Sequence, residues 1–344
     1  MKATFKKHTL QFKVPGGTSR GVLNTKDTYY IIIEANGIKG IGECGLMRGL
    51  SIDDKPDYEE KLAWVCDNIS LGLDDLYNKL TDWPSIQFGL EQAFKMLENG
   101  GSFTLFDSPF AKGERGIPTN GLIWMGTADY MSQQIEQKLD EGYTCLKLKI
   151  GAIDWNEEFA LLKRLRSRFD ALDLEIRVDA NGAFDFYTAE KVLDQLAELE
   201  IHSIEQPIKA GQWEEMAALV EDSIVPIALD EELIGVHDLA KRKKLISTIA
   251  PDYLILKPSF IGGWRGADNW IELAVDYGID WWATSALESN VGLNAIAQWV
   301  ANKRFRLPQG LGTGSLFTNN IHSPLKIKDT ALWIDPKENW EFSI

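Results

Sequence analysis

The stretch Thr144-Cys145-Leu146-Lys147-Leu148-Lys149-Ile150-Gly151 joins a short apolar run to two lysines. Its polar and apolar side chains alternate, as they do in a β-strand, so Lys147 and Lys149 point to the same face. Because neighbouring ammonium groups repel each other, we expect the pKa of at least one lysine to lie below the usual value of about 10.4. Such a lysine can act as a base near neutral pH. An isolated pair of this kind is more often solvent-exposed, so the residues that follow decide between the two interpretations.

Four apolar runs further along the chain end at charged residues. The runs at residues 174–178, 202–204, 226–229 and 253–256 are followed by Asp179, Glu205, Asp230 and Lys257. Starting from Lys149, successive charged positions are roughly thirty residues apart, which is the length of one strand plus one crossover helix. The carboxyl ends of successive parallel strands meet at one mouth of a barrel. We therefore expect a single site that contains a lysine, three carboxylates and a second lysine.

In this order the motifs resemble those of the enolase superfamily, specifically its muconate-lactonizing subgroup. The motifs are Lys147-x-Lys149, Asp179-Ala180-Asn181-Gly182, Glu205-Gln206-Pro207, Asp230-Glu231 and Lys257-Pro258. Within that subgroup the chain is most similar to the o-succinylbenzoate synthase family of menaquinone biosynthesis. Each motif is weak alone, but the ordered set is specific, and the resemblance covers nearly the whole chain.

The carboxylates of Asp179, Glu205 and Asp230 are hard oxygen ligands suited to Mg2+. Any one of them could instead cap the helix after its strand, but the ordered set favours metal binding. We therefore predict a Mg2+ site, with Mn2+ as a possible substitute. Asn181 shares a strand face with Asp179 and is predicted to support the metal ligands from behind. Glu231 either does the same or forms an ion pair.

The lysines acquire a chemical role beside a metal ion. Removing a proton next to a carboxylate creates an enediolate, whose negative charge requires a cation in place. By resemblance, Lys149 is the general base that removes this proton. Lys257 faces it across the mouth of the barrel and is either a second acid/base or an electrostatic support. Lys147 completes the predicted catalytic set.

The order of strand and helix signals changes along the chain. Residues 1–42 alternate like antiparallel strands around a loop at 15–21 that is rich in breakers, and helical patterns follow at about 57–68, 73–79 and 86–97. From residue 120 strands and helices alternate. The eight expected strands begin near residues 121, 145, 174, 202, 226, 252, 280 and 305.

These patterns predict an α/β fold with two domains, which 344 residues are enough to build. We expect an α+β capping domain at residues 1–115 and a (β/α)7β modified TIM barrel at residues 116–314. The remaining segment, 315–344, is expected to return to the capping domain, as the resemblance implies.

Composition narrows the classes of partner. The chain is 44% hydrophobic and 25% charged, which is ordinary for a globular protein, and its net charge is -15. This charge argues against binding to nucleic acid and to anionic membranes, although a local site can still attract a small anionic carboxylate substrate. The three cysteines match no zinc or disulfide pattern, and the first residues lack the apolar core of a signal peptide. We expect a cytoplasmic enzyme.

Substrate contacts are expected from loops at the strand ends. Ser285 lies in the loop at 285–289, and Gly312 and Thr313 lie in the loop at 310–314, where free backbone N–H groups can bind a carboxylate. Turn formation alone explains these glycines about equally well. The loop around Arg20 and the segment 47–51 resemble the two capping loops of the family, and an arginine there can pair with an anionic substrate.

Four functions remain under comparison. The first is o-succinylbenzoate synthase activity, the loss of water from a succinyl-hydroxy-cyclohexadiene carboxylate. The second is an epimerase or racemase, such as a dipeptide epimerase or N-acylamino acid racemase, in which Lys149 and Lys257 exchange protons. Dipeptide epimerases usually carry two acidic residues on the eighth strand, whereas residues 312–315 have none. A Schiff-base aldolase explains one lysine but leaves the carboxylates without a purpose, and a non-catalytic barrel leaves the whole set unused.

Overall fold

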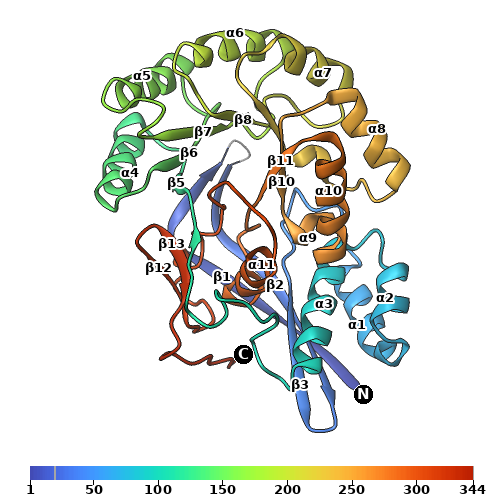
Figure 1. Cartoon of the computed structure of the whole chain (residues 1–344). Coiled ribbons are helices and arrows are strands. Elements are labelled where there is room, and N and C mark those ends of the chain that lie inside the picture. The colour runs from blue at the N-terminus through green and yellow to red at the C-terminus, as the bar shows by residue number, and fades with distance from the viewer. Residues whose placement is uncertain (19–20, 344) are drawn as a thin grey trace.

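A computed structural model describes residues 1–18 and 21–343 of the protein (Figure 1). The capping domain begins with a three-stranded antiparallel sheet in the order β1-β2-β3. Its strands are β1 (Lys2–Thr18), β2 (Gly21–Ala35) and β3 (Ile38–Cys44). Three α-helices and a 3-10 helix follow: α1 (Tyr58–Asp67), η1 (Ile69–Leu71), α2 (Leu73–Lys79) and α3 (Pro84–Glu98).

Helix α3 lies directly against strand β3, and two glycines permit this close approach. A Cβ atom added to Gly42 would lie 1.8 Å from the carbonyl oxygen of Gly89 on α3, so only glycine fits there. The buried face of β2, which includes Tyr29, Ile31 and Ile33, packs in the same core. The sheet and its helices therefore form the expected α+β unit.

The expected loop at residues 15–21 was largely wrong. Strand β1 continues to Thr18 and β2 starts at Gly21. The pairing register shifts between Gln11 and Gly16. This irregularity explains how Pro15, which has no N–H to donate, lies within a strand. Arg20 lies outside the described residues.

The barrel consists of seven parallel strands in the order of the chain, and most of its helices lie outside them. Figure 1 shows helices α4 to α8 in an arc around these strands. The strands are β5 (Gly121–Ile123), β6 (Cys145–Lys149), β7 (Glu175–Asp179), β8 (Ser203–Glu205), β9 (Ile227–Leu229), β10 (Tyr253–Leu256) and β11 (Asp280–Ala283). The helices are α4 (Ala128–Asp140), α5 (Trp155–Arg166), α6 (Phe186–Ala197), α7 (Trp213–Asp222), η2 (Glu231–Leu233), α8 (Leu239–Ile249), α9 (Pro258–Ile261), α10 (Gly263–Tyr277) and α11 (Asn290–Ala301).

The eighth strand is reduced to two single bridges. Thr119 pairs with Gln309, and Thr284, just after β11, pairs with Gly310. The expected strand start near Phe305 was therefore wrong by a few residues, since Phe305 lies in no strand. Because the bridges link the two sides of the sheet, the fold is the expected (β/α)7β barrel with an α+β capping domain.

Residues after 314 contact both parts of the molecule. Strands β12 (Leu325–Lys328) and β13 (Ala331–Ile334) form a small sheet with β4 (Ile117–Pro118), which precedes the barrel. Asn319 bonds to the outer edge of β1: its Oδ1 accepts from the N–H of Gln11 at 2.8 Å, and its Nδ2 donates to the carbonyl of Thr9 at 2.9 Å. The rings of Phe12 and Phe317 lie 4.8 Å apart.

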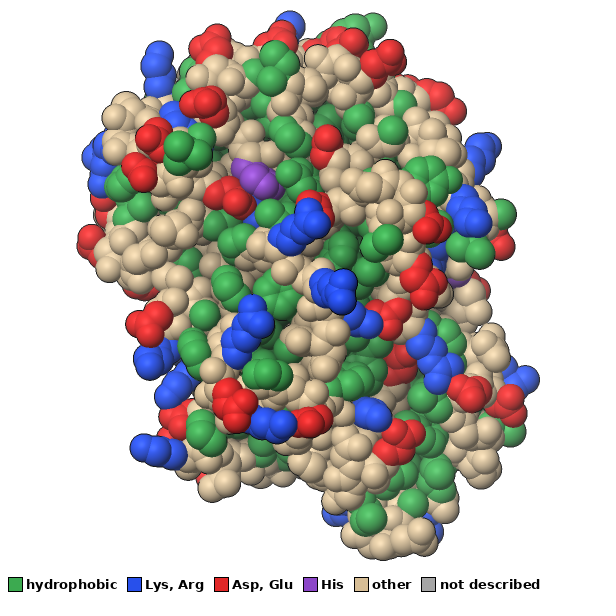
Figure 2. Space-filling model, in the orientation of Figure 1, with side chains coloured by type: hydrophobic (Ala, Val, Ile, Leu, Met, Phe, Trp, Pro, Cys, Tyr) green, Lys and Arg blue, Asp and Glu red, His purple; other side chains and the backbone are tan. Residues whose placement is uncertain are grey.

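The surface is mixed in charge. Figure 2 shows acidic and basic side chains interspersed over one face of the molecule. Among the described residues, no helix has both the length and the apolar character that crossing a membrane requires.

Candidate active site

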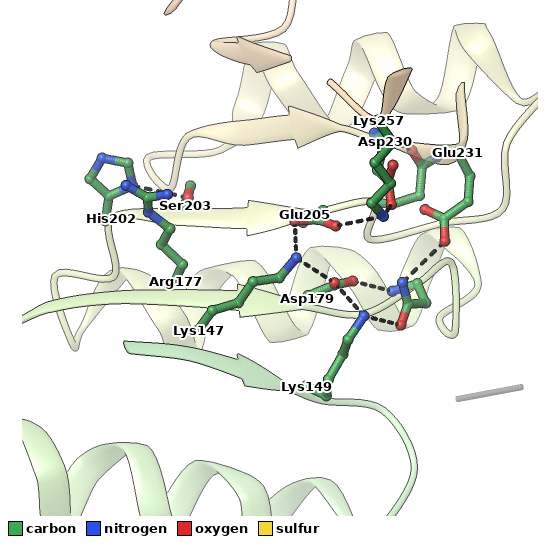
Figure 3. Close-up of polar contacts among 12 residues, drawn as sticks. Lys147, Lys149, Arg177, Asp179, His202, Ser203, Glu205, Asp230, Glu231 and Lys257 are labelled. Carbon is green, nitrogen blue, oxygen red and sulfur yellow. Dashed lines mark hydrogen bonds and ion pairs between the residues drawn. The ribbon is translucent and has the colours of Figure 1, made fainter. Parts of the chain in front are cut away.

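Strand register brings the predicted charged residues to one place. Lys149 pairs in register with Asp179, and Asp179 with Glu205. Asp230 directly follows β9, and Lys257 directly follows β10. All five therefore lie at the carboxyl ends of five consecutive strands, and Figure 3 shows their charged groups turned toward one another.

The lysine ammonium groups lie between the carboxylates. Lys147 Nζ donates to Glu205 Oε2 at 2.5 Å and lies 2.9 Å from Asp179 Oδ2. Lys149 Nζ donates to the same Asp179 oxygen at 2.6 Å. Lys257 Nζ donates to Asp230 Oδ2 and lies 4.0 Å from Glu205 Oε1. The geometry thus joins all three lysines and all three carboxylates in one buried network.

The lysines of the pair differ in pKa although they share a strand face. Burial lowers the pKa of Lys149, Asp179 counteracts this effect, and repulsion from Lys147 lowers the pKa further. Burial also acts on Lys147, but Asp179 and Glu205 raise its pKa above the usual value. At least one pKa is lowered, as expected. Burial is the larger cause, however, whereas the sequence analysis relied on repulsion alone.

The donor set fits a divalent cation in its chemistry. In the described ranges, no three His, Cys, Asp or Glu side chains are arranged to hold a metal ion as they stand, and lysine ammonium groups lie between the carboxylates. Glu205 Oε1 is buried and has no hydrogen-bond partner among the described residues. Burial raises the pKa of Glu205 to about 8, and repulsion from Asp179 and Asp230 contributes. A hard dication would relieve both the unmet acceptor and this repulsion.

Asn181 and Glu231 lie behind the network. Asn181 Oδ1 accepts from Lys149 Nζ at 2.7 Å, and its Nδ2 donates to Glu231 Oε1 at 3.0 Å. The backbone of Asn181 has a φ of 46°, a left-handed conformation that asparagine tolerates better than most residues. Asn181 therefore links Glu231 to Lys149 through two hydrogen bonds.

A cavity of about 780 Å³ opens over the lysines, and both domains line it. Ser285, Gly312 and Thr313, the predicted substrate contacts, all lie on its wall. The hydroxyl of Ser285, however, donates to Glu288 at 2.8 Å, and its backbone N–H donates to the carbonyl of Gly310. Ser285 therefore faces the cavity with its donors already in use. Thr313 Oγ1, in contrast, is buried without a hydrogen-bond partner in the part of the chain that is described.

Two cavity residues were missed by the sequence analysis. Asn120 Oδ1 and Thr284 Oγ1 line the cavity and are buried, and neither has a hydrogen-bond partner within residues 1–18 and 21–343. The carbonyl of Asn120 is 3.8 Å from a Cβ built on Gly312, which places both near the bridges that close the barrel. In the sequence Asn120-Gly121 resembles an ordinary turn, so it gave no signal of a site.

The capping domain contributes the cover of the cavity. Met47, Arg48 and Leu50 line it, in agreement with the expectation for segment 47–51. Arg48 is already paired, however, because its Nη1 lies 2.6 Å from Asp54 Oδ1. Arg20, the other predicted anion contact, falls outside the described residues.

Comparison with known proteins agrees with this geometry. Residues 130–336 match the family model described as Enolase C-terminal domain-like. Over 365 aligned residues the chain is 45% identical to the o-succinylbenzoate synthase of Desulfotalea psychrophila, and the alignment covers 97% of this chain and 99% of that protein. The chain belongs to the enolase superfamily and to its o-succinylbenzoate synthase family.

Solved structures with a similar fold include other members of the enolase superfamily. The crystal structure of MenC from Desulfotalea psychrophila has a TM-score of 0.86 and 41% identity, and the match covers 97% of this chain and 99% of that chain. A dipeptide epimerase from Enterococcus faecalis, complexed with Mg and the dipeptide L-Leu-L-Tyr, has a TM-score of 0.84 with 97% and 96% covered. At 18% identity the epimerase shows the shared fold alone.

Proposed function

We propose that this protein is an o-succinylbenzoate synthase. It would remove water from 2-succinyl-6-hydroxy-2,4-cyclohexadiene-1-carboxylate, a small anionic carboxylate, to give 2-succinylbenzoate in menaquinone biosynthesis. The observation that carries the proposal is 45% identity to an o-succinylbenzoate synthase across 97% of the chain. The charged network at the strand ends supports it, because proton removal beside a carboxylate needs a base and a cation together.

Asp179, Glu205 and Asp230 would hold Mg2+, with Mn2+ as a possible substitute. When bound, the cation would stabilise the negative charge that develops on the substrate carboxylate. The unpartnered Glu205 Oε1, judged within the described residues, supports this assignment. Lys147 and Lys257 add positive charge around the same carboxylates, and Asn181 and Glu231 keep Lys149 oriented.

Lys149 is assigned the proton transfers. Its amine would remove the ring proton alpha to the carboxylate, and the electron pair of the broken C–H bond would be delocalised onto that carboxylate. The ammonium group formed would then give this proton to the departing hydroxyl on the same face, the C–O bond would break, and water would leave as the ring becomes aromatic. One base suffices for this syn sequence. Lys149 lies on the cavity wall, which supports its access to substrate.

The cavity would bind the remaining polar groups of the substrate through atoms that have no hydrogen-bond partner among the described residues. The hydroxyls of Thr313 and Thr284 could donate to substrate oxygens, and Asn120 Oδ1 could accept from the substrate hydroxyl. Gly312 leaves open space beside them, since among the described residues a Cβ there would meet only the Asn120 carbonyl within 4 Å. We keep Ser285 as a wall residue and retain Arg20 as the proposed partner of a substrate anion, on the strength of the sequence alone.

Epimerisation is the second candidate, because Lys149 and Lys257 approach one carboxylate cluster from different strands. That arrangement suits a two-base exchange. Residues 310–315 contain no carboxylate to pair with a substrate ammonium, however, and an unpaired buried charge is costly. Family membership leaves the Schiff-base aldolase and the non-catalytic barrel without support.

Turnover assays decide between the two candidates. Formation of an aromatic ring has a distinct ultraviolet signal, so dehydration of the cyclohexadiene can be followed directly. The same preparation is tested with dipeptides and N-acyl amino acids. We expect kcat/KM to be far higher for the cyclohexadiene. Faster epimerisation of dipeptides or N-acyl amino acids would reject the proposal.

A further inference from the structure

A buried charge cluster joins the capping domain to the barrel outside the active-site network. It consists of Lys26 on β2, Glu43 on β3 and Glu288 in the loop after β11, which we call the interdomain cluster. The exposed fractions of these side chains are 5%, 0% and 0%. Burying three ionised groups is expensive unless each has partners, so their contacts indicate what the cluster does.

Glu43 has a complete set of donors. Its carboxylate accepts from the backbone N–H groups of Ser289 and Gly292, both at 2.8 Å, at the start of α11. The hydroxyls of Thr28 and Ser289 also donate to it. A helix N-terminus stabilises a carboxylate, so the donors at the start of α11 satisfy Glu43 without an ammonium partner.

Glu288 is bonded only by hydroxyl groups among the described residues. Ser259 Oγ donates to Glu288 Oε1 at 2.6 Å, and Ser285 Oγ donates to Oε2 at 2.8 Å. Neutral hydroxyls leave most of the charge uncompensated. Lys26 is buried on the same face of β2 as Thr28, the residue that donates to Glu43. Its Nζ is buried and makes no hydrogen bond in the described part of the chain. Burial lowers the pKa of Lys26, and the charges of Glu288 and Glu43 counteract that effect.

Glu288 thereby connects the loop after β11 with helix α9, which directly follows Lys257. Ser285 lies on the cavity wall, and Ser259 follows Lys257 by two residues. Ser285 Oγ also accepts from the N–H of Leu287 at 2.9 Å, which holds Leu287 at a left-handed φ of 61°. The capping domain packs directly against Ser259 and Glu288. A Cβ on Gly45 would lie 2.6 Å from Ser259 Oγ and 2.9 Å from Glu288 Cγ.

We propose that Glu288 is a positioning residue, which fixes the cavity wall at Ser285 relative to Lys257, and that Lys26 of the capping domain supplies its counter-charge. The effect on catalysis rests on the proposed function. In this arrangement the capping domain contributes a charge as well as a cover. The loop at residues 285–289 and helix α9 therefore keep their relative positions only while the domain is docked.

A double-mutant cycle tests the coupling in the full-length protein. Lys26→Met leaves a buried carboxylate without its counter-charge, and we expect kcat/KM for the cyclohexadiene to fall about tenfold or more. Glu288→Gln retains the shape and removes the charge, so we expect a higher KM with unchanged Mg2+ affinity. The double variant should recover activity to within about threefold of Glu288→Gln alone. Lys39→Met, an exposed lysine on the same sheet, is the matched control and should leave kcat/KM unchanged.

Amide hydrogen exchange of residues 285–289 provides a readout that needs no substrate. We expect faster exchange in Lys26→Met and slower exchange again in the double variant. Multiplicative effects of the two substitutions overturn the coupling, and wild-type kcat and KM in folded Glu288→Gln overturn the positioning role. If Lys26→Met alone fails to fold, a folded double variant supports the coupling and an unfolded one rejects it. A wild-type protein without dehydration activity rejects the proposed function only, since the exchange cycle still applies.

Discussion

Strand β7 carries two buried charges of opposite character. Arg177 and Asp179 are two residues apart on one face of the strand, with 1% and 0% of their surfaces exposed. Arg177 Nε donates to Glu175 at 2.6 Å, its Nη1 donates to the carbonyl of Pro308 at 3.0 Å, and its guanidinium lies 4.1 Å from the ring centre of Trp282. Figure 3 shows Arg177 turned away from the lysine network, beside His202.

Asp179 lies among other charged side chains. Two lysine ammonium groups contact one of its oxygens, and Glu205 beside it has an oxygen without a hydrogen-bond partner among the described residues. Arg177 is paired with Glu175 and held by a backbone carbonyl and a ring, so its charge is balanced within the structure. Glu205, in contrast, is repelled by two other carboxylates and keeps one oxygen without a hydrogen-bond partner among the described residues. The charge of Arg177 is therefore structural, whereas we propose that the charge of Asp179 is functional.

The largest effect is expected in the charged network around Asp179. Lys149→Ala removes the proposed base, so turnover should fall by about a thousandfold or more. Exchange of deuterium into the alpha position of the substrate should disappear with it, while Mg2+ still binds. Exchange that persists in the folded variant would assign the base to Lys257 or Lys147.

A substitution at Arg177 should change the stability of the fold instead of the activity. Arg177→Met removes a buried cation from Glu175 and from the face of Trp282, and the free energy of unfolding should fall by about 3 kcal/mol. The kcat of the folded fraction should stay near the wild-type value. Chemical denaturation and initial rates measure the two quantities, and a large loss of kcat at full stability would erase the proposed distinction.

Mg2+ affinity tests whether Glu205, whose Oε1 has no hydrogen-bond partner among the described residues, binds the metal. Glu205→Gln keeps the shape of the side chain but removes the charge, so Mg2+ affinity should fall by at least about 100-fold, as calorimetry can measure. Chelation should abolish wild-type activity, and added Mg2+ should restore it. Full activity after rigorous chelation would contradict the assignment of Asp179, Glu205 and Asp230 as ligands of an essential Mg2+ ion.

A milder change is expected at Lys257. Lys257→Arg keeps the positive charge but is a poor proton donor or acceptor at neutral pH. If Lys257 acts by its charge, kcat for dehydration should stay within about tenfold of wild type. Loss of dehydration together with loss of proton exchange on one face of the substrate would favour two-base chemistry.

The smallest expected effect is on the pH dependence of stability, and it involves Glu175, the partner of Arg177. Burial acts to raise the pKa of Glu175, but Arg177, followed by His202 and a hydrogen bond from Cys145, lowers it below the usual 4.5. A lowered folded-state pKa contributes stability above pH 4.5, and this stability is lost as the pH falls through the folded-state pKa. Glu175→Gln should therefore be less stable than wild type at pH 7, and the difference should shrink in acid. A constant difference across thermal melts at several pH values would contradict this.

The charged strand ends could be predicted from sequence because the chemistry requires particular residue types at positions that the strand spacing fixes. Lys149, Asp179 and Lys257 follow runs that are long and apolar enough to be recognised. The eighth strand was misplaced because single bridges at Gln309 and Gly310 need no apolar run.

Other features depend on neighbours that only the folded chain brings together. Asn120 and Thr284 become candidate ligands because nothing beside them completes their hydrogen bonds in the described residues. The contact of Arg177 with Trp282 likewise joins positions far apart in sequence. The hydroxyl of Ser285 donates to Glu288, a contact that the sequence of the loop cannot reveal.

The bonds between Asn319 and β1 have a consequence for how the molecule is made. Thr9 and Asn319 are separated by 310 positions, so the outer edge of β1 leaves the ribosome long before its partner exists. At about 5–20 residues per second, the wait is roughly 15–60 s. An unpaired edge strand can recruit other chains, and lysines along it discourage such pairing. β1, at the edge of its sheet, carries Lys2, Lys6, Lys7 and Lys13. These charges disfavour pairing with other chains during the time before residue 319 has been synthesised.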